Sequence, residues 1–206
     1  MKQYPSIPSS NGQSFSDIGY AIVFDKLDGS NLRVEWTKKS GWNKWGTRQR
    51  LFDHTDEIFA PAIQVFEKKL LEPMTKICVD NRWERVIAFM EYWGENSFAG
   101  LRDPDDEKFL TLFDVNVHKK GLVAPREFIK IFKNVDIPNI VCECNWTRGF
   151  VERVRGGEID GITLEGVVGK SGSGHHLKMA KAKTQKWIDL VKARYTAEEA
   201  EKILNS

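Results

Sequence analysis

The hydrophobic and polar positions change period along the chain. Short apolar or alternating runs, bounded by Gly, Asp and Asn, are interspersed with a few segments of helical period. Such runs predict strands at about residues 20–25, 31–37, 85–93, 109–117, 139–145, 162–169 and 177–182. Several of these strands follow one another without a helix between them. We therefore expect an α+β fold with antiparallel sheets and not a doubly wound parallel sheet.

The segments of helical period predict five helices. The first places Phe59, Ala62, Ile63, Phe66 and Leu70 on one face. The last opens with Thr196-x-x-Glu199, a capping-box pattern. The remaining three are expected at 125–133, near 148–155, and at 184–193, where Trp187, Leu190 and Val191 share the buried face.

Length and composition describe an ordinary folded chain. The 206 residues are 41% hydrophobic and 11% aromatic, which is enough for a buried core. No repeat, low-complexity tract or linker divides the sequence, so we expect a single domain over 1–206 with C-terminal helices in 184–206. The sequence does not fix the oligomeric state, and a monomer is the simplest expectation.

The sequence also bears on the compartment. No run approaches the roughly 18 apolar residues of a membrane helix, and no apolar stretch of a secretion signal follows the first residues. Three Cys do not form a disulfide framework. We expect no membrane partner, free thiols and a cytoplasmic protein, in the host cytoplasm if the chain is viral.

The formal net charge of +2 conceals an uneven distribution. An acidic stretch over 95–107 separates two basic segments. The first lies in 33–50 and contains Arg33, Lys38, Lys39, Lys44, Arg48 and Arg50 against Glu35. The second lies in 168–194 and contains Lys170, Lys178, Lys181, Lys183, Lys186, Lys192 and Arg194 against Asp189. These segments are suited to phosphates, and Trp42 or Trp45 could stack on a base or pack on a hairpin.

The most informative stretch is Ile22 to Val34. An apolar strand runs into Asp25 and Lys26, turns over Asp28-Gly29 and resumes as an alternating strand. One interpretation is a hairpin with Lys26 solvated. The other is a nucleophilic Lys26 at the end of a strand. The second arrangement resembles the Lys-x-Asp-Gly signature of the covalent nucleotidyltransferases, which include the ATP-dependent DNA and RNA ligases and the messenger-RNA capping enzymes.

Later segments resemble the remaining motifs of that superfamily, in the same order. The resemblance implies that Glu91 contacts the ribose, that Phe113 stacks on the purine, that Glu165 helps to hold the metal, and that Lys181 and Lys183 meet the α-phosphate. The segments are Phe89-Met90-Glu91-Tyr92-Trp93-Gly94, Leu112-Phe113-Asp114-Val115, Leu164-Glu165-Gly166-Val167-Val168 and Lys181-Ala182-Lys183. Five motifs in the same order between residues 26 and 183 indicate that the resemblance does not arise by chance.

Within the superfamily, the chain is most similar to the RNA-ligase branch of nick-sealing phage enzymes and RNA-editing ligases. There the fifth motif continues to a third lysine and an aromatic residue, as Lys186-Trp187 does here. The resemblance implies that Asp25 approaches the adenine amino group, although the family more often has Glu. It also implies that Asn31 acts at the phosphate and that an Arg contacts the ribose, for which Arg48 is preferred to Arg50.

The chemistry suits these residue types. A lysine attacks phosphorus as the neutral amine, and at pH 7 only about one ordinary lysine in a few thousand is neutral. Lys181, Lys183 and a bound Mg²⁺ (or Mn²⁺) would disfavour the ammonium form of Lys26. Mg²⁺ takes one or two carboxylates and keeps its other waters, so Glu165 is the expected metal ligand. The resemblance treats Asp28 as a ribose and active-site contact.

The resemblance then implies a fold and a reaction. The fold is a nucleotidyltransferase (ATP-grasp-like) domain of antiparallel sheets flanked by helices, with the active site in the cleft between sheets. The reaction is ATP-dependent RNA ligation. Lys26 becomes lysyl-AMP, AMP passes to a 5′-phosphate end, and a 3′-hydroxyl displaces AMP. The expected partner is nicked or broken RNA, possibly in an RNA/DNA duplex, and the expected role is RNA repair.

Two alternatives remain. One is a minimal DNA ligase or a GTP-using capping enzyme. Those typically append an oligonucleotide-binding barrel, whereas only 23 residues follow Lys183, so we expect no such barrel. The other is a non-catalytic protein that binds RNA ends. Complete motifs favour the enzyme.

Overall fold

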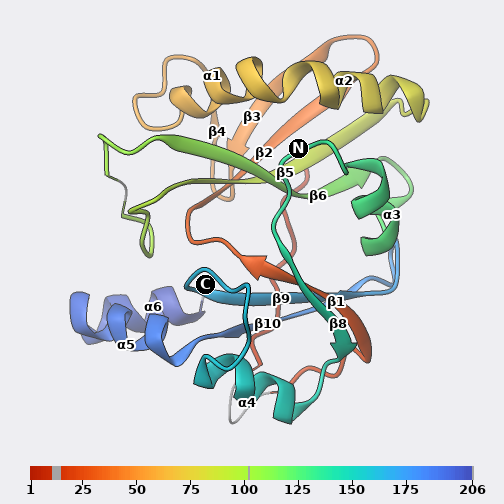
Figure 1. The fold of residues 1–206 in the computed structure, drawn as a ribbon. Helices are drawn as coiled ribbons and strands as arrows, with labels where there is room; N and C mark the ends of the chain where they lie inside the picture. The colour runs from red at the N-terminus through yellow and green to blue at the C-terminus, as the bar shows by residue number, and fades with distance from the viewer. Residues whose placement is uncertain (11–14, 102, 206) are drawn as a thin grey trace. The chain divides into compact units, whose positions relative to one another are not determined.

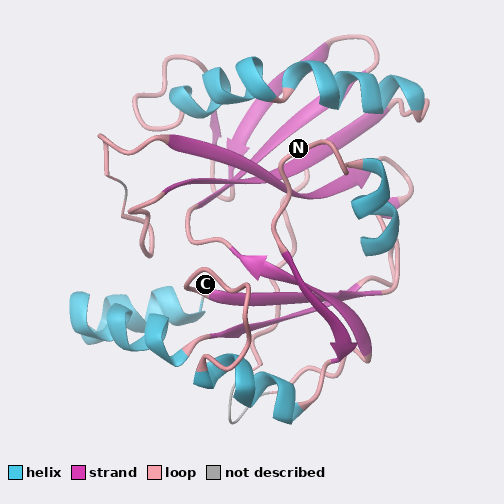
Figure 2. Ribbon diagram, viewed as in Figure 1, coloured by secondary structure: helices cyan, strands magenta, loops and turns pink. Residues whose placement is uncertain are grey.

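The computed structural model describes residues 1–10, 15–101 and 103–205. Its strands form two antiparallel sheets, one of four and one of six strands, with helices packed on them (Figures 1 and 2). The expected α+β class with antiparallel sheets is therefore confirmed. Contacts divide the chain into two compact units. The first comprises Met1–Tyr4, Gly29–Ile137 and Ser173–His175, and the second comprises Pro5–Asp28, Pro138–Gly172 and His176–Ser206.

The first unit is built on the six-stranded sheet, in the order β4-β3-β2-β5-β6-β7. All its neighbouring strands pair antiparallel. The strands are β2 (Ser30–Thr37), β3 (Gly41–Thr47), β4 (Leu51–Phe52), β5 (Arg85–Gly94), β6 (Lys108–Val117) and β7 (Gly121–Leu122). The helices are α1 (Ala60–Lys69), α2 (Leu71–Asp80) and α3 (Pro125–Ile131).

Alternation along the strands gives this sheet two different faces. On β2, Leu32, Val34 and Trp36 belong to the main core, and the alternate residues of β5 join them. Helices α1 and α2 run along this face, where Phe66 and Met74 are fully buried (Figure 1). The residues that alternate with these core residues along β2 and β5 point to the other face of the sheet, which we call the polar face.

A β-bulge shapes the polar face of the first unit. Phe89 pairs with Asp114 and Met90 with Leu112, so Phe113 is the extra residue on β6. A bulge leaves one residue out of the ladder and re-aims its side chain. The Phe113 ring packs against Phe89 and, edge-on, against Tyr4.

The second unit is built on the four-stranded sheet, in the order β10-β9-β1-β8. The apolar residues of one face, including Val23, Val167 and Ala180, pack with Trp146 and Val154 around α4. The strands are β1 (Tyr20–Lys26), β8 (Ile140–Asn145), β9 (Gly166–Ser171) and β10 (Lys178–Lys183), and the helices are α4 (Arg148–Gly156), α5 (Gln185–Arg194) and α6 (Ala197–Asn205).

The N-termini of α5 and α6 follow local sequence rules. Thr184 precedes α5, and its hydroxyl accepts a hydrogen bond from the Trp187 amide at 3.1 Å. The capping box predicted at Thr196 and Glu199 is present, because the Glu199 carboxylate accepts from the Thr196 amide at 3.0 Å. Both helices predicted within 184–206 are therefore found, whereas the single-domain assignment of 1–206 stays a prediction.

Several expectations were wrong in detail. The hairpin alternative for Lys26 fails, because β1 and β2 do not pair and belong to different sheets. The strand expected from residue 162 begins only at Gly166, since residues 162–165 form a loop held by hydrogen bonds to Asp25 and Thr184. Strands β3, β4 and β7 and helix α2 were not predicted, and β3 is the strand that carries the two tryptophans.

The tryptophans of the first basic segment belong to the core. Trp45 is buried and packs on Phe52 and Phe66. Trp42 is partly buried, packs on Phe66, and donates its indole N–H to Thr75 Oγ1 at 3.0 Å. The hairpin alternative is therefore correct for this pair.

The second basic segment is divided in the same way. Lys170, Lys181 and Lys183 are buried, whereas Lys178, Lys186 and Lys192 are exposed. Lys170 lies on β9 and Lys181 and Lys183 lie on β10, and all three point to the face of the sheet opposite to the core. The segment is therefore not a continuous exposed surface for phosphates.

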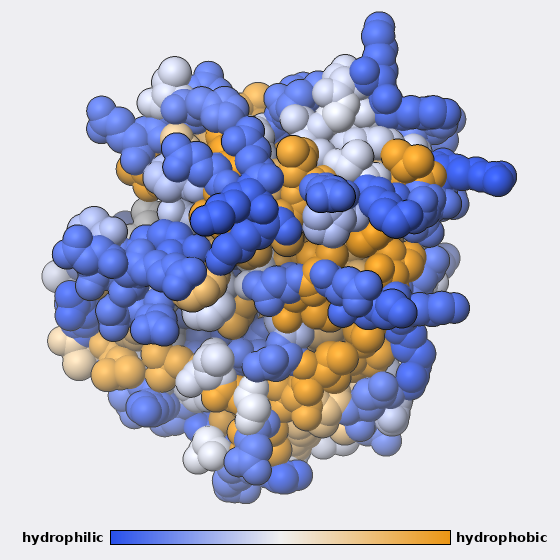
Figure 3. Space-filling view, turned by 45° about the horizontal axis from the view of Figure 1, so that its top comes forward, coloured by the Kyte–Doolittle hydropathy of each residue, from blue (hydrophilic) through white to orange (hydrophobic). Residues whose placement is uncertain are grey.

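The visible surface in Figure 3 is largely hydrophilic, with hydrophobic patches between the charged side chains. Among the described helices, none is long and apolar enough to cross a membrane. The large apolar side chains with the greatest exposure are Tyr20, Leu51, Ile58, Leu71, Val79, Leu101, Ile140 and Leu190.

Gly166 provides a test of the second unit. Its φ is 151°, and a Cβ there would lie 2.0 Å from the Ala182 carbonyl oxygen. We predict that Gly166→Ala lowers the free energy of unfolding by roughly 1–3 kcal/mol or more, because backbone strain adds to the collision. Urea denaturation measures this. Gly149→Ala is the matched control, since nothing lies within 4 Å of a Cβ in that helix. Equal stability of the two variants would contradict the prediction.

Candidate active site

The ends of three neighbouring strands bring two lysines together in the second unit. Lys26 on β1 pairs with Gly166 on β9, and Gly166 pairs with Lys183 on β10. Residues directly opposite each other in an antiparallel sheet point to the same face. Gly166 has no side chain, so no side chain at this position separates Lys26 from Lys183.

Glu165 links the two lysines. Lys26 Nζ donates to Glu165 Oε2 at 2.6 Å, and Lys183 Nζ lies 3.5 Å from Glu165 Oε1. The Glu165 side chain is 6% exposed and that of Lys183 4%, whereas that of Lys26 retains 24%. Lys26 is therefore the accessible member of the cluster, and it is ion-paired and not simply solvated.

Lys183 is held from several directions. Its ammonium group donates to the carbonyls of Ile203 and Leu204 at 3.1 and 3.3 Å, near the end of α6. It also lies 4.4 Å from the centre of the Trp187 ring, a cation–π contact. Burial lowers the pKa of Lys183, and the positive charge of Lys26 acts in the same direction, while Glu165 opposes both.

Asp28 and Lys181 complete the part of the predicted site that lies in this unit. The Trp187 indole donates to Asp28 Oδ2 at 2.6 Å, so Asp28 is fixed beside the ring that covers Lys183. Lys181 pairs with Val168 and is buried on the same face as Lys183. The structure therefore places Lys26, Asp28, Glu165, Lys181 and Lys183 in one unit, with direct contacts between Lys26, Glu165 and Lys183.

Asp25 is oriented differently from Lys26. It follows Ala21 and Val23 on the core side of β1 and is 3% exposed. Its Oδ1 accepts a hydrogen bond from the Thr163 amide at 3.0 Å, and its Oδ2 has no hydrogen-bond partner among the described residues. Burial raises the pKa of Asp25 above its usual value. The expected contact of Asp25 with adenine stays a prediction.

The other predicted residues lie in the first unit. Asn31 pairs with Glu91 across β2 and β5, so both side chains point to the polar face. Phe113 is half-buried on that face with Phe89. The structure thus brings Asn31, Glu91 and Phe113 to one face of one sheet, and their roles toward a nucleotide stay predictions.

The first unit also distinguishes Arg48 from Arg50. Arg50 is occupied on the surface, where it forms an ion pair with Asp56 and lies over the Phe59 ring. Arg48 is exposed in the turn after β3, and its positive charge opposes the rise in pKa that burial and Asp114 impose on Tyr4. Arg50 is therefore held by partners within the first unit, and the preference for Arg48 stays a prediction.

The contacts of two side chains were not predicted from the sequence, those of Tyr4 in the first unit and those of Trp187 in the second. Tyr4 is buried between Phe89 and Phe113 and donates its hydroxyl to Asp114. Burial raises the pKa of Tyr4 well above its usual value, and the Asp114 carboxylate adds to this. Trp187 was placed in a helix core and at the aromatic position of the fifth motif, but its contacts with Asp28 and Lys183 were not predicted. No local pattern marks either contact, because the partners are 110 and 159 residues away.

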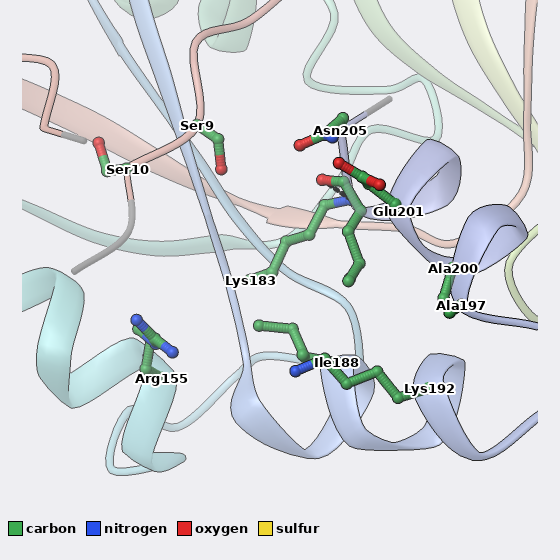
Figure 4. A pocket seen from close by; sticks show the side chains of 11 residues that line it. Ser9, Ser10, Arg155, Lys183, Ile188, Lys192, Ala197, Ala200, Glu201 and Asn205 are labelled. Carbon is green, nitrogen blue, oxygen red and sulfur yellow. Dashed lines mark hydrogen bonds between the residues drawn. The ribbon is translucent and has the colours of Figure 1, made fainter. Parts of the chain in front are cut away.

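A cavity of about 720 Å³ opens beside Lys183 (Figure 4). Side chains of α5 and α6 form much of its wall, and Arg155 and Lys192 contribute positive charge. The lining residues are Ser9, Ser10, Arg155, Lys183, Ile188, Lys192, Ala197, Ala200, Glu201, Leu204 and Asn205.

Carboxylates near Lys183 could contribute to a metal site. The described residues contain no group of three or more His, Cys, Asp or Glu side chains placed to enclose an ion. Glu165 and Asp28 are both close enough to Lys183 to act on its charge. Two carboxylates suit Mg²⁺ or Mn²⁺, which keep several bound waters, better than they suit Zn²⁺.

Comparison with solved structures identifies the fold. A variant of Naegleria gruberi RNA ligase with ATP and manganese matches 86% of this chain and 53% of its own, with a TM-score of 0.63 and 16% identity. The same RNA ligase with pyrophosphate gives a TM-score of 0.63 and 17% identity over 85% of this chain and 52% of its own. Another variant with ATP and manganese matches 98% of this chain and 64% of its own, with a TM-score of 0.58 and 15% identity.

No protein-family model and no curated protein matches the chain. The chain spans about half the length of the first two RNA-ligase structures described above. The structural likeness covers most of this chain at low identity. The chain therefore has the nucleotidyltransferase-type fold seen in these RNA-ligase structures.

Asp25 gives a pH-dependent test. Because the folded pKa is raised above 3.8, the folded chain takes up this proton before the unfolded chain as the pH falls. The cost of burying the carboxylate is thus full at pH 7 and is relieved toward pH 4. We predict that Asp25→Asn stabilises the fold at pH 7 and that this gain shrinks with decreasing pH.

Urea denaturation at several pH values measures the effect. Asp160→Asn, at an exposed position in the same unit, is the control and should change little. A lower stability of Asp25→Asn at pH 7 would show that the fold needs the ionised carboxylate.

Proposed function

We propose that this chain is an ATP-dependent RNA ligase that forms a covalent lysyl-AMP intermediate on Lys26. The observation that carries the proposal is the contact of Glu165 with both Lys26 and Lys183 at the ends of three adjacent strands. The Lys26 side chain is 24% exposed, so a nucleotide can reach it. The buried Lys183 beside it can bind the negative charge of a phosphate. The RNA-ligase fold supports the same assignment.

The first step is an attack of the Lys26 amine on the α-phosphorus of ATP. The N–P bond forms, the bond to pyrophosphate breaks, and the amine loses its proton to solvent. A carboxylate 2.6 Å away stabilises the ammonium ion, which has no lone pair for attack. The contact of Lys26 with Glu165 must therefore be given up before reaction, and Glu165 holds the side chain in place until then.

Lys183 is suited to the developing charge on the α-phosphate. Its ammonium group is anchored by Glu165, by two backbone carbonyls and by the Trp187 ring, so little reorganisation is needed. Preorganised charge in a buried site is worth more than the same charge in water. Positioning and electrostatic stabilisation are the main demands of phosphoryl transfer.

A divalent ion would complete the site. Glu165 is the residue expected to hold Mg²⁺ or Mn²⁺, with Asp28 as the second carboxylate near Lys183. When bound, the ion would draw charge from the α-phosphate and favour the neutral amine of Lys26. The N. gruberi RNA ligase structures with ATP and manganese support this choice of cofactors.

The remaining steps concern RNA. AMP passes from Lys26 to a 5′-phosphate end, and a 3′-hydroxyl then attacks that phosphate and releases AMP. We propose nicked or broken RNA, possibly in an RNA/DNA duplex, as the substrate. The exposed residues Lys38, Lys39 and Lys44 of the first basic segment are suited to its phosphates. Asn31, Arg48, Glu91 and Phe113 are the proposed contacts to the nucleotide.

The covalent step is tested by labelling. We predict that the protein incubated with α-labelled ATP and Mg²⁺ retains label after denaturation, and that Lys26→Ala and Lys26→Arg retain none. Arg keeps the positive charge but offers no comparable nucleophile, so it separates charge from chemistry. Parallel incubations with GTP and NAD test the alternatives. Label from GTP alone, or a labelled Lys26→Ala variant, would refute the proposal.

The RNA interaction is tested by charge removal. We predict that replacing Lys38, Lys39 and Lys44 by Gln weakens RNA binding at low salt and reduces the slope of log K against log salt by up to about three, because each lost phosphate contact removes about one. Filter binding or anisotropy measures this. Lys76→Gln, an exposed lysine on α2, is the control. Unchanged low-salt binding by the triple variant would contradict the prediction.

A further inference from the structure

A buried arginine on the polar face of the first unit has little to bind within the described chain. Arg33 is 5% exposed, and its Nη1 donates to the Met1 carbonyl at 3.4 Å. Its Nε has no hydrogen-bond partner in the part of the chain that the structure describes. Burying a guanidinium without a carboxylate or several hydrogen bonds is costly. Burial lowers the pKa of Arg33.

The same sheet contains an arginine in the ordinary arrangement. Arg85 on β5 uses Nε and Nη2 to bind Glu35 Oε2, at 3.0 and 2.6 Å. This is the fork with which guanidinium groups hold carboxylates and phosphates. The corresponding edge of Arg33 contacts no carboxylate of the described chain.

The neighbours of Arg33 leave room for its side chain. Arg33 lies between Phe89 on β5 and Gly46 on β3 in the sheet. A Cβ at Gly46 would lie 3.1 Å from Arg33 Nε and 3.0 Å from the Met1 side chain. The glycine therefore lets the guanidinium lie over β3, and a side chain at residue 46 would press against Nε.

We propose that Arg33 binds a phosphate group of the substrate, through the Nε edge that the folded chain leaves without a partner. The proposal rests on the proposed function, and it adds to it a residue outside the motifs that suggested the function. The phosphate belongs either to the triphosphate of the nucleotide or to the RNA strand. A phosphate supplies the two oxygens that the fork accepts, and its negative charge offsets the cost of burying Arg33.

The test uses Arg33→Met, which keeps an unbranched apolar stem and removes the charge. Because the free protein loses only a poorly paired buried charge, its melting temperature should stay equal or rise. Arg85→Met is the matched control. It leaves Glu35 buried without a partner, so it should lower the melting temperature and leave substrate binding unchanged.

Two assays distinguish the sources of the phosphate. One is lysyl-AMP formation at varied ATP concentration, and the other is sealing of pre-adenylated nicked RNA without ATP. If Arg33 binds the nucleotide, Arg33→Met raises the KM for ATP by about tenfold or more and leaves sealing unchanged. If it binds RNA, sealing falls by a similar factor, and lysyl-AMP formation is unchanged.

Failure of this inference is separable from failure of the proposed function. If the unmutated protein forms lysyl-AMP and Arg33→Met matches it in both assays, the inference is wrong and the proposed function stands. If the unmutated protein forms no adduct, thermal shift with inorganic tripolyphosphate decides. The inference requires stabilisation of the unmutated protein and a weaker shift for Arg33→Met. A variant that melts earlier than the unmutated protein would show that Arg33 is structural, and would overturn the proposal.

Discussion

The site in the second unit depends on one carboxylate shared between two lysines. Glu165 lies 2.6 Å from Lys26 and 3.5 Å from Lys183, at the point where three strands end together. Without Glu165, two ammonium groups on one face would repel each other, and the buried one would have lost its ionic partner. The same contact holds Lys26 in its unreactive ammonium form. Glu165 therefore both assembles the site and restrains it.

The backbone has to satisfy this arrangement. Gly166 follows Glu165 and pairs with both lysines, in a conformation that a Cβ would not allow. Thr184 connects the same region to α5, because its amide donates to the Glu165 carbonyl and its hydroxyl to the Leu164 carbonyl. Trp187 one turn later covers Lys183 and binds Asp28. The short segments around residues 165 and 184 thus set the geometry of the whole cluster.

Much of this could be predicted from the sequence. Alternation and helical period located the long strands and most helices, because burial on one face leaves a regular pattern. The motif residues Lys26, Glu165 and Lys183 were identified by resemblance and lie together. Contacts between distant residues could not be predicted in this way. The support of Lys183 by the carbonyls of α6 and the packing of Tyr4 beside Phe113 depend on register and chain path, which no short sequence pattern encodes. Strand β3 was not predicted because burial does not alternate along it, since Asn43 and Lys44 are both exposed and Trp45 and Gly46 are both buried.

The buried charged side chains of the first unit differ in how well they are paired. Glu35 and Arg85 satisfy each other, whereas Arg33 is buried with one long hydrogen bond. A charge that is buried at a cost in free energy is expected where a ligand offsets that cost.

The covalent role of Lys26 is tested most directly by peptide mass spectrometry of the protein after incubation with ATP and Mg²⁺. We expect one AMP, on the peptide that contains Lys26. AMP on Lys181 or Lys183 instead, or no modified lysine at all, would contradict this role.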